Sequence, residues 1–306
     1  MRLTSFQRLA IWTLATTYFL ILVGGLVRAS GAGLGCPDWP RCFGSWIPPA
    51  SAANLPPQFD PSQFNPTLMW TEYLNRILGV TVGFLILATA VSAWRHHRRD
   101  PHILWTTIAA FLLVGFEGWL GGRVVAHELA AWIVTAHLIV AIIIVQLLLY
   151  ATYASSAQGP PSRPDALRAE ADAQGAVTWA VGGLIALTLL QAGFGTQVRG
   201  AVDAALDSGV ARELAISTVG WLDLIHRDLA FVLLIGSTLL TLWLMSKRSP
   251  LVNWSLIVLA LAGLQIAVGI YMAYGYLLPA AQVAHLTLSS LLLGAETVLW
   301  LMSRSR

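Results

Sequence analysis

The sequence predicts an all-α integral membrane protein of eight transmembrane helices, arranged as two pseudo-symmetric four-helix bundles. Three observations lead to this prediction. Hydrophobic residues make up 57% of the 306 residues and charged residues only 11%, against about 25% charged in an ordinary soluble domain. Eight apolar runs approach or exceed the roughly 20 helical residues that cross a bilayer. Polar motifs of the first four runs recur in the last four.

The predicted spans follow one another with short connections except at two places. In order they cover residues 8–27, 69–94, 102–122, 131–153, 176–198, 217–246, 251–274 and 279–302. A long loop, 29–68, follows the first span. A polar, proline-containing stretch, 155–175, separates an N-terminal half (1–154) from a C-terminal half (176–306), and we interpret it as a cytoplasmic linker.

The distribution of Lys and Arg near the span ends predicts that both termini are cytoplasmic. Eleven cations lie on the side of the N-terminus: Arg2, Arg8, Arg95, Arg98, Arg99, Arg163, Arg168, Lys247, Arg248, Arg304 and Arg306. Five lie on the opposite side: Arg28, Arg41, Arg123, Arg199 and Arg212. The loop 29–68 is then outside, where a disulfide between Cys36 and Cys42 can persist. No cleavable signal peptide is expected, because the first apolar run exceeds signal length and lacks an A-x-A site. A net charge of +3 is too small to indicate nucleic-acid binding.

An internal repeat relates the two halves. Trp70–Arg76 in the second span matches Trp221–Arg227 in the sixth, 151 positions later. Ala136–Leu138 in the fourth span matches Ala284–Leu286 in the eighth, 148 positions later. Because each half has an even number of spans, the halves share one topology, and we predict that an axis along the membrane normal relates them.

Ionisable side chains inside membrane spans are costly and usually mark function. Two related trios occur: Glu72, Asn75 and Arg76 in the second span, and Asp223, His226 and Arg227 in the sixth. Their i, i+3, i+4 spacing places each trio on one helix face. All six residues lie toward the outer ends of their spans, as do His137 and His285 in the fourth and eighth.

We predict that His226 and His285 ligate a haem iron from both sides, as imidazoles on facing helices of a bundle can do. The alternative is two polar histidines that hydrogen-bond within the bundle. In the first half His137 is present, but Asn75 stands where the repeat predicts a histidine. A haem in that half would be held by one imidazole. Its open sixth position suits a reaction site, whereas the doubly ligated iron suits electron transfer.

Several polar residues have two interpretations. Glu72 can exchange a proton beside a reacting haem, or it can be the ion-pair partner of Arg76. Arg76 and Arg227 can bind haem propionates, since guanidinium suits carboxylates, or each can form a structural pair within its trio. His127, in the loop after the third span, can replace the missing ligand or be a solvated loop histidine.

The residues resemble those of a known family. Gly24–Gly31 and Leu34–Cys42 resemble the first outer loop of haem A synthases, the bacterial CtaA and mitochondrial Cox15-like proteins. The polar motifs around Glu72, His137, His226 and His285 fall where that family has its four polar helix motifs. The resemblance covers nearly the whole chain, and the segment Cys36–Pro40 is its most specific part.

This resemblance implies an oxidoreductase that converts the C8 methyl of haem O to the formyl group of haem A by successive hydroxylation, for haem–copper oxidase biogenesis. It implies that His226 and His285 hold the iron of haem b in the second half, while the first half receives haem O as substrate at His137. Glu72 matches the family's outer-side carboxylate and is the predicted catalytic residue. The further residues expected at the haems are Asn75, Arg76 and Arg227. Cys36 and Cys42 match a cysteine pair, which is either a disulfide that staples the loop or a thiol pair that takes part in haem handover.

The resemblance also implies partners and a location. Haem O synthase, a prenyltransferase, is expected to deliver the substrate in the bacterial inner membrane. The electron donor is expected to be a separate, unidentified membrane component, because no predicted domain could bind a nucleotide. The protein is expected to lie in a lipid bilayer and to bind no nucleic acid. Its oligomeric state, including a homo-oligomer, is left open. Asn75 departs from the family, in which many members have a histidine there.

Three other classes of protein share parts of this pattern. A non-catalytic membrane haem b electron carrier would have four histidines in two matched pairs, and Asn75 argues against it. A repeat-built transporter would have broken helices with polar groups at the midplane. A haem-binding assembly factor without activity is distinguished from a synthase only by measuring activity.

Overall fold

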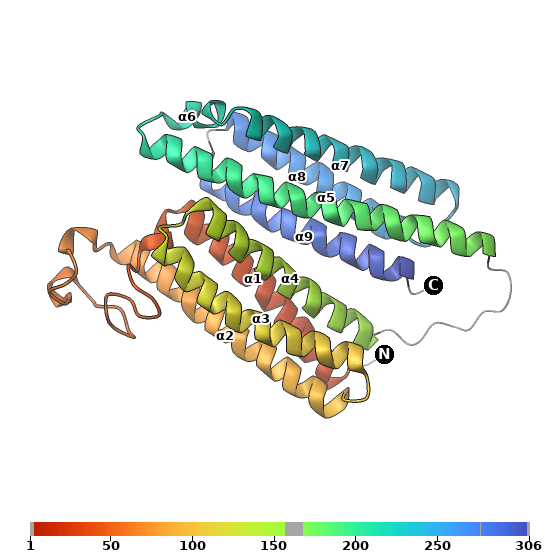
Figure 1. Ribbon diagram of the computed structural model, residues 1–306, viewed down its shortest axis with the longest axis horizontal. Helices are drawn as coiled ribbons and strands as arrows, with labels where there is room; N and C mark the ends of the chain where they lie inside the picture. The colour runs from red at the N-terminus through yellow and green to blue at the C-terminus, as the bar shows by residue number, and fades with distance from the viewer. Residues whose placement is uncertain (1–2, 157–167, 276, 305–306) are drawn as a thin grey trace. The chain divides into compact units, whose positions relative to one another are not determined.

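A computed structural model describes residues 3–156, 168–275 and 277–304. Within these ranges the chain forms nine α-helices and four short 3-10 helices, with no β-strand (Figure 1). The α-helices are α1 (Ser5–Ala29), α2 (Pro66–His96), α3 (Pro101–Ala126), α4 (Ala131–Ser156), α5 (Arg168–Asp207), α6 (Arg212–Ala215), α7 (Trp221–Ser246), α8 (Val252–Tyr274) and α9 (Pro279–Arg304). The 3-10 helices are η1 (Ala32–Leu34), η2 (Ala52–Asn54), η3 (Pro61–Gln63) and η4 (Ile216–Thr218).

The eight predicted membrane spans are confirmed as eight long apolar helices, all of the α-helices except α6. Most of them extend a few residues beyond the predicted limits. The largest difference is at α5, which continues to Asp207 rather than ending near 198. Arg199 and Asp203 form an ion pair at 2.8 Å on consecutive turns of this extension, and such an i, i+4 pair favours helix.

The predicted sixth span, 217–246, begins later than expected. Gly220 has a φ of 69° and precedes α7, which starts at Trp221. The preceding residues form α6 and η4, a connection that hydropathy did not predict. Glycine adopts a positive φ without steric penalty. Gly220 therefore allows the chain to turn between η4 and α7.

Contacts between Cα atoms divide the chain into two compact units. Unit 1 comprises Met1–Leu148 and Leu278–Thr287, and unit 2 comprises Leu149–Leu277 and Leu288–Arg306. The arrangement as two pseudo-symmetric bundles stays a prediction. The predicted linker lies for the greater part (157–167) outside the described residues, as do the predicted inner-side cations Arg2, Arg163 and Arg306.

Unit 1 has a hydrophobic core to which all of its first four helices contribute. Val82 and Ile86 of α2, Ala110 of α3 and Ile144 and Leu148 of α4 are buried in it. Leucines of α1 pack against this cluster. Along the chain, α1 lies beside α2 and α2 beside α3 (Figure 1), so the polar face of α2 is held at a fixed place in the unit.

Unit 2 has its own core, built from α5, α7, α8 and the later part of α9. Val181 of α5, Leu244 of α7, Val258 of α8 and Leu299 of α9 are each at most 1% exposed. A polar contact lies beside it: Thr188 Oγ1 donates to Glu296 Oε1 at 2.9 Å, and Glu296 is fully buried.

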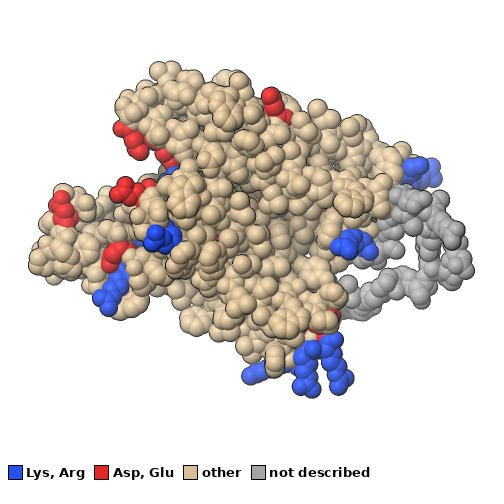
Figure 2. Space-filling view, in the orientation of Figure 1, with Lys and Arg blue, Asp and Glu red and all other residues tan. Residues whose placement is uncertain are grey.

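The ends of α2 and α3 are fixed by their sequences. Asn65 caps α2 and Asp100 caps α3, and each is followed by proline at the first helical position, where proline has no hydrogen bond to lose. The turn between these helices carries exposed Arg95, Arg98 and Arg99, and Figure 2 shows basic side chains gathered at this turn. The opposite end of α2 carries the long loop 29–68.

Candidate functional site

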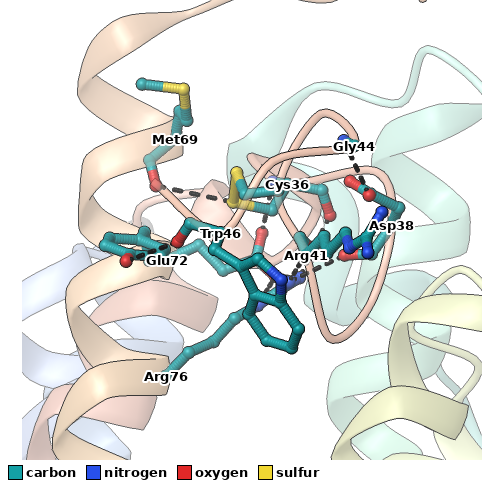
Figure 3. Close-up of a disulfide and its surroundings, with 10 residues drawn as sticks. Cys36, Asp38, Arg41, Gly44, Trp46, Met69, Glu72 and Arg76 are labelled. Carbon is teal, nitrogen blue, oxygen red and sulfur yellow. Dashed lines mark hydrogen bonds and ion pairs between the residues drawn. A yellow bond between two sulfur atoms is a disulfide. The ribbon is translucent and has the colours of Figure 1, made fainter. Parts of the chain in front are cut away.

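The loop that precedes α2 folds back onto the first two turns of that helix. Cys36 and Cys42 are joined by a disulfide with a Cα–Cα distance of 4.8 Å (Figure 3). Together with Phe43 and Met69 they form a buried cluster, and each of the four is at most 1% exposed. The loop is therefore a packed structure with a small core of its own.

Glu72 binds the loop at the backbone of Cys36. Its Oε2 accepts a hydrogen bond from the Cys36 backbone N–H at 2.7 Å, and its Oε1 pairs with Arg76. Glu72 is only 4% exposed. A buried carboxylate needs such partners, because an uncompensated charge in this setting is strongly destabilising.

Arg76 connects Glu72 to three carbonyl groups of the loop (Figure 3). Its Nη1 donates to Asp38 O at 2.7 Å and to Arg41 O at 2.8 Å, and its Nη2 donates to Cys36 O at 3.2 Å. Its Nε and Nη2 also donate to Glu72 Oε1. A guanidinium has five N–H groups, and these five bonds use all of them.

These contacts bear on the alternatives left open by the sequence. The pair Glu72–Arg76 is formed in the structure, and a haem propionate would reach Arg76 only after the loop released it. Tyr73, one residue from Glu72, donates from its hydroxyl to Trp46 O at 2.7 Å and adds a further anchor for the loop. The roles of Glu72 in proton exchange and of Arg76 in haem binding stay predictions.

Two glycines allow the loop to approach the helices. A Cβ at Gly35 would overlap the backbone of Leu68, and a Cβ at Gly122 of α3 would lie 2.8 Å from Trp39 Cδ2. Trp39 thus lies directly on the α3 backbone. Beside it is an open pocket of ≈ 370 Å³ whose lining includes Asp38, Trp119 and Arg123.

His137 of α4 is held from α3. Its Nδ1 lies 3.1 Å from Glu117 Oε1, whose side chain is 13% exposed. The Nδ1 atom is buried and makes no hydrogen bond of good geometry within the described residues, so its approach to Glu117 is an ion-pair contact. The His137 side chain as a whole is 40% exposed. Gly121, one turn further along α3, leaves room beside the ring: a Cβ there would lie 3.5 Å from His137 Cε1.

Asn75 lies on α2 between Glu72 and Arg76 and is half-buried. Its Oδ1 is buried, and it has no hydrogen-bond partner within the part of the chain that the structure describes. The sequence before Arg28 matches that before Arg199, so Gly24 corresponds to Gly195. A Cβ at Gly24 would have nothing within 4 Å, whereas a Cβ at Gly195 would lie against the His226 ring. The glycine of the first half thus has no side chain packed against it within 4 Å.

In unit 2 the corresponding trio has a different setting. Asp223 Oδ2 pairs with Arg227 Nη2 at 2.7 Å, and the Arg227 side chain is 40% exposed. The imidazole of His226 packs against Gly195, where a Cβ would lie 3.1 Å from its Cε1. Gln191 of α5 donates to the carbonyl of His226 at 2.7 Å. His285 lies in the α9 segment that belongs to unit 1 and is half-buried.

The assignment of His137, His226 and His285 as haem ligands stays a prediction. The described residues contain no cluster of three or more His, Cys, Asp or Glu for a bare metal ion. A porphyrin supplies four of the iron ligands itself, so the protein needs to offer only imidazoles. The predicted ligand His137 has its Nδ1 beside Glu117 and a side chain that is 40% exposed.

The sequence does not predict a role for Glu117. It does not predict the contacts of Arg76 with loop carbonyls either. The contact from Glu117 to His137 joins two helices across 20 positions, which helical spacing within one span cannot predict. The available signal was the carboxylate itself, in the middle of an apolar span. His127 keeps its Nδ1 on the carbonyl of Arg123 at 2.9 Å and its ring against Trp132.

Comparisons with known proteins agree with this architecture. The family model COX15-CtaA, described as cytochrome oxidase assembly protein, matches residues 7–297. Proteins named heme A synthase are similar: that of Geobacillus kaustophilus is 33% identical over 121 residues, covering 40% of this chain and 33% of the relative. That of Shewanella oneidensis is 33% identical over 144 residues, covering 45% and 42%. That of Bartonella quintana is 28% identical over 204 residues, covering 59% and 54%.

The matched segments thus span about a third to a half of the length of these curated relatives. The family match, in contrast, extends over almost all of the chain and includes each of the eight apolar helices. The chain belongs to the COX15-CtaA family of cytochrome oxidase assembly proteins.

Proposed function

We propose that the chain is a haem A synthase, which oxidises the C8 methyl of haem O to the formyl group of haem A for the assembly of haem–copper oxidases. The family match and the relatives named heme A synthase support this activity. The observation in the structure that carries the proposal is His137. Its Nδ1 lies beside Glu117, and 40% of the His137 side chain is exposed, in a largely apolar helix.

Unit 1 is the proposed substrate site. His137 would bind the iron of haem O through Nε2, because Nδ1 faces Glu117. Asn75 corresponds to His226 in the sequence repeat. Its amide is a poor ligand for iron, so this half would offer a single imidazole. His226 and His285 are the predicted ligands of haem b, which would serve as the electron donor to this site.

The docked loop is the proposed cover of the substrate site at the outer end of α2. Glu72 and Arg76 keep it in place through the Cys36 N–H and three carbonyl groups. A site that excludes water protects a partly oxidised product from side reactions. Two successive hydroxylations of the methyl give a hydrated aldehyde, which loses water to become the formyl group. Dioxygen and a membrane electron donor are the co-reactants, and haem O synthase supplies the substrate.

The test is pigment extraction from the purified full chain, produced together with haem O synthase, with haems separated by chromatography and identified by mass. We expect haem B together with haem A or its hydroxylated precursor. The variant His137→Ala should keep haem B and contain no haem A. Haem B alone in the unmodified chain, with haem O present in the membrane, would contradict the synthase activity.

A further inference from the structure

Glu117 is an unusual residue for its position. It lies in the C-terminal half of α3, within a mostly apolar stretch of the helix, and its side chain is 13% exposed. Its Oε2 is buried without a hydrogen-bond partner in the described residues, and its Oε1 lies 3.1 Å from His137 Nδ1, an ion-pair contact that falls short of hydrogen-bond geometry. A carboxyl group is costly in such a place and is retained when it serves a site. The group that it contacts is the imidazole.

The sequence repeat gives the residue that corresponds to Glu117 in the other half. His137 and His285 are 148 positions apart, and the same offset takes Glu117 to Gln265 of α8. The neighbouring glycines agree with this alignment, since Gly115 and Gly121 correspond to Gly263 and Gly269. Gln265 has a buried Oε1 with no hydrogen-bond partner in the described residues. The two halves therefore share a pattern, Gly-x-Glu-x-x-x-Gly in one and Gly-x-Gln-x-x-x-Gly in the other.

We propose that Glu117 is a positioning residue that orients His137 for iron through Nε2, and that its carboxylate gives the iron of the first half a lower reduction potential than it would have beside an amide. The proposal rests on the assignment of His137 as an axial ligand under the proposed function. A histidine that donates its second N–H to a carboxylate has a fixed tautomer and is a more basic ligand. A more basic ligand stabilises the ferric state, and ligand tuning of this kind is one of the protein's means of setting a haem potential.

The carboxylate of Glu117 and the amide of Gln265 differ in one property that matters here. They have nearly the same shape, and both can accept a hydrogen bond, but only the carboxylate brings a negative charge. Charge-assisted hydrogen bonds are roughly twice as strong as neutral ones. The exchange Glu117→Gln thus tests the charge while it preserves the packing, and Gln265→Glu makes the reciprocal change.

The experiment is a potentiometric titration of the full chain loaded with haem B in both halves, followed by optical spectroscopy. His137→Ala and His226→Ala assign the two transitions to the first and second half. We expect Glu117→Gln to keep both haems and to raise the midpoint potential of the first-half haem only. Gln265→Glu should lower the potential of the second-half haem only. The unchanged transition in each variant serves as the control for folding.

Two outcomes would overturn the proposal and are distinct from each other. If Glu117→Gln retains the first-half haem with an unchanged potential and spectrum, the carboxylate does not tune that iron. If His137→Ala loses no haem, the ligand assignment of the proposed function fails as well. A chain that shows the expected shift but converts no haem O would contradict the synthase activity and leave the role of Glu117 intact.

Discussion

Glu72 and Arg76 form the same kind of i, i+4 ion pair as Asp223 and Arg227. Glu72 and Arg76 also form hydrogen bonds with the backbone of the cysteine loop. We expect Glu72→Ala to undock the cysteine loop, because Arg76 loses its counter-charge and the Cys36 N–H loses its acceptor. Removing one partner of a buried pair costs about 3 kcal/mol, which corresponds to roughly a hundredfold larger undocked population. The measurement is the rate at which a brief reductant pulse followed by alkylation modifies Cys36 and Cys42, read by mass.

Asp223→Ala is the matched control for this experiment, because it removes a similar i, i+4 pair in unit 2, whereas the cysteine loop belongs to unit 1. Its alkylation rate should equal that of the unmodified chain. Equal rates for Glu72→Ala and Asp223→Ala would contradict the role of Glu72 as an anchor.

Gly195 offers a second test at the scale of one residue. An alanine Cβ there would lie 3.1 Å from His226 Cε1, so the imidazole would have to shift by a few tenths of an ångström. We expect Gly195→Ala to lower the haem B content of the purified chain and to alter the spectrum of the second-half haem. Gly193→Ala, where nothing lies within 4 Å of the added atom, should behave as the unmodified chain does. An unaffected Gly195→Ala would indicate that His226 is not a ligand or that its ring has room to move.

The residue scale also shows what the sequence could not predict. The trios on α2 and α7 and the histidines are visible in the sequence, because ionisable residues stand out in apolar spans. Their partners are not visible. Arg76 reaches carbonyl groups 35 to 40 positions away, and backbone carbonyls carry no sequence signal. Glu117 is visible as a carboxylate within an apolar stretch, yet its contact with His137 depends on how α3 packs beside α4.

At the scale of elements, hydropathy was sufficient for the eight spans and insufficient for their connections. The apolar helices follow from composition, and Asn65 and Asp100 mark the starts of α2 and α3. The segment between α5 and α7 was not predicted, because α6, η4 and the extension of α5 are short or amphipathic and depend on local contacts. The fold of the loop 29–68 was likewise not predicted beyond its cysteine pair.

The docking of this loop on α3 leads to a third prediction. Gly122→Ala would place a Cβ 2.8 Å from the Trp39 ring, and overpacking of this kind typically costs 1 to 3 kcal/mol. We expect faster proteolysis within residues 29–68 in the intact detergent-solubilised chain. Gly118→Ala, on the same helix with nothing within 4 Å of the new atom, is the control. Equal cleavage of the two variants would show that the docking of the loop does not depend on the contact between Trp39 and Gly122.

The whole molecule consists of two units, each with a separate hydrophobic core. His137 belongs to unit 1 and His226 to unit 2, while His285, the second predicted ligand of haem b, lies in the α9 segment of unit 1. The substitution of His137 or His226 should therefore leave the core of the other unit intact. The proposed function then requires two haem sites that can be emptied one at a time. This requirement concerns the chain as a whole, and the content of haem per chain measures it directly.

We therefore expect His137→Ala and His226→Ala each to remove about one haem of two from the purified chain, and the double variant to remove both. The haem that remains in each single variant should keep its own spectrum. Since electrons reach the substrate site from haem b in the proposed function, His226→Ala should still bind haem O but accumulate it unoxidised, whereas His137→Ala should fail to retain it. Haem extraction with quantification per chain distinguishes these cases. If either single substitution removes both haems while the chain stays folded, the two histidines serve one shared site, and the division of labour between substrate half and electron-supplying half is wrong.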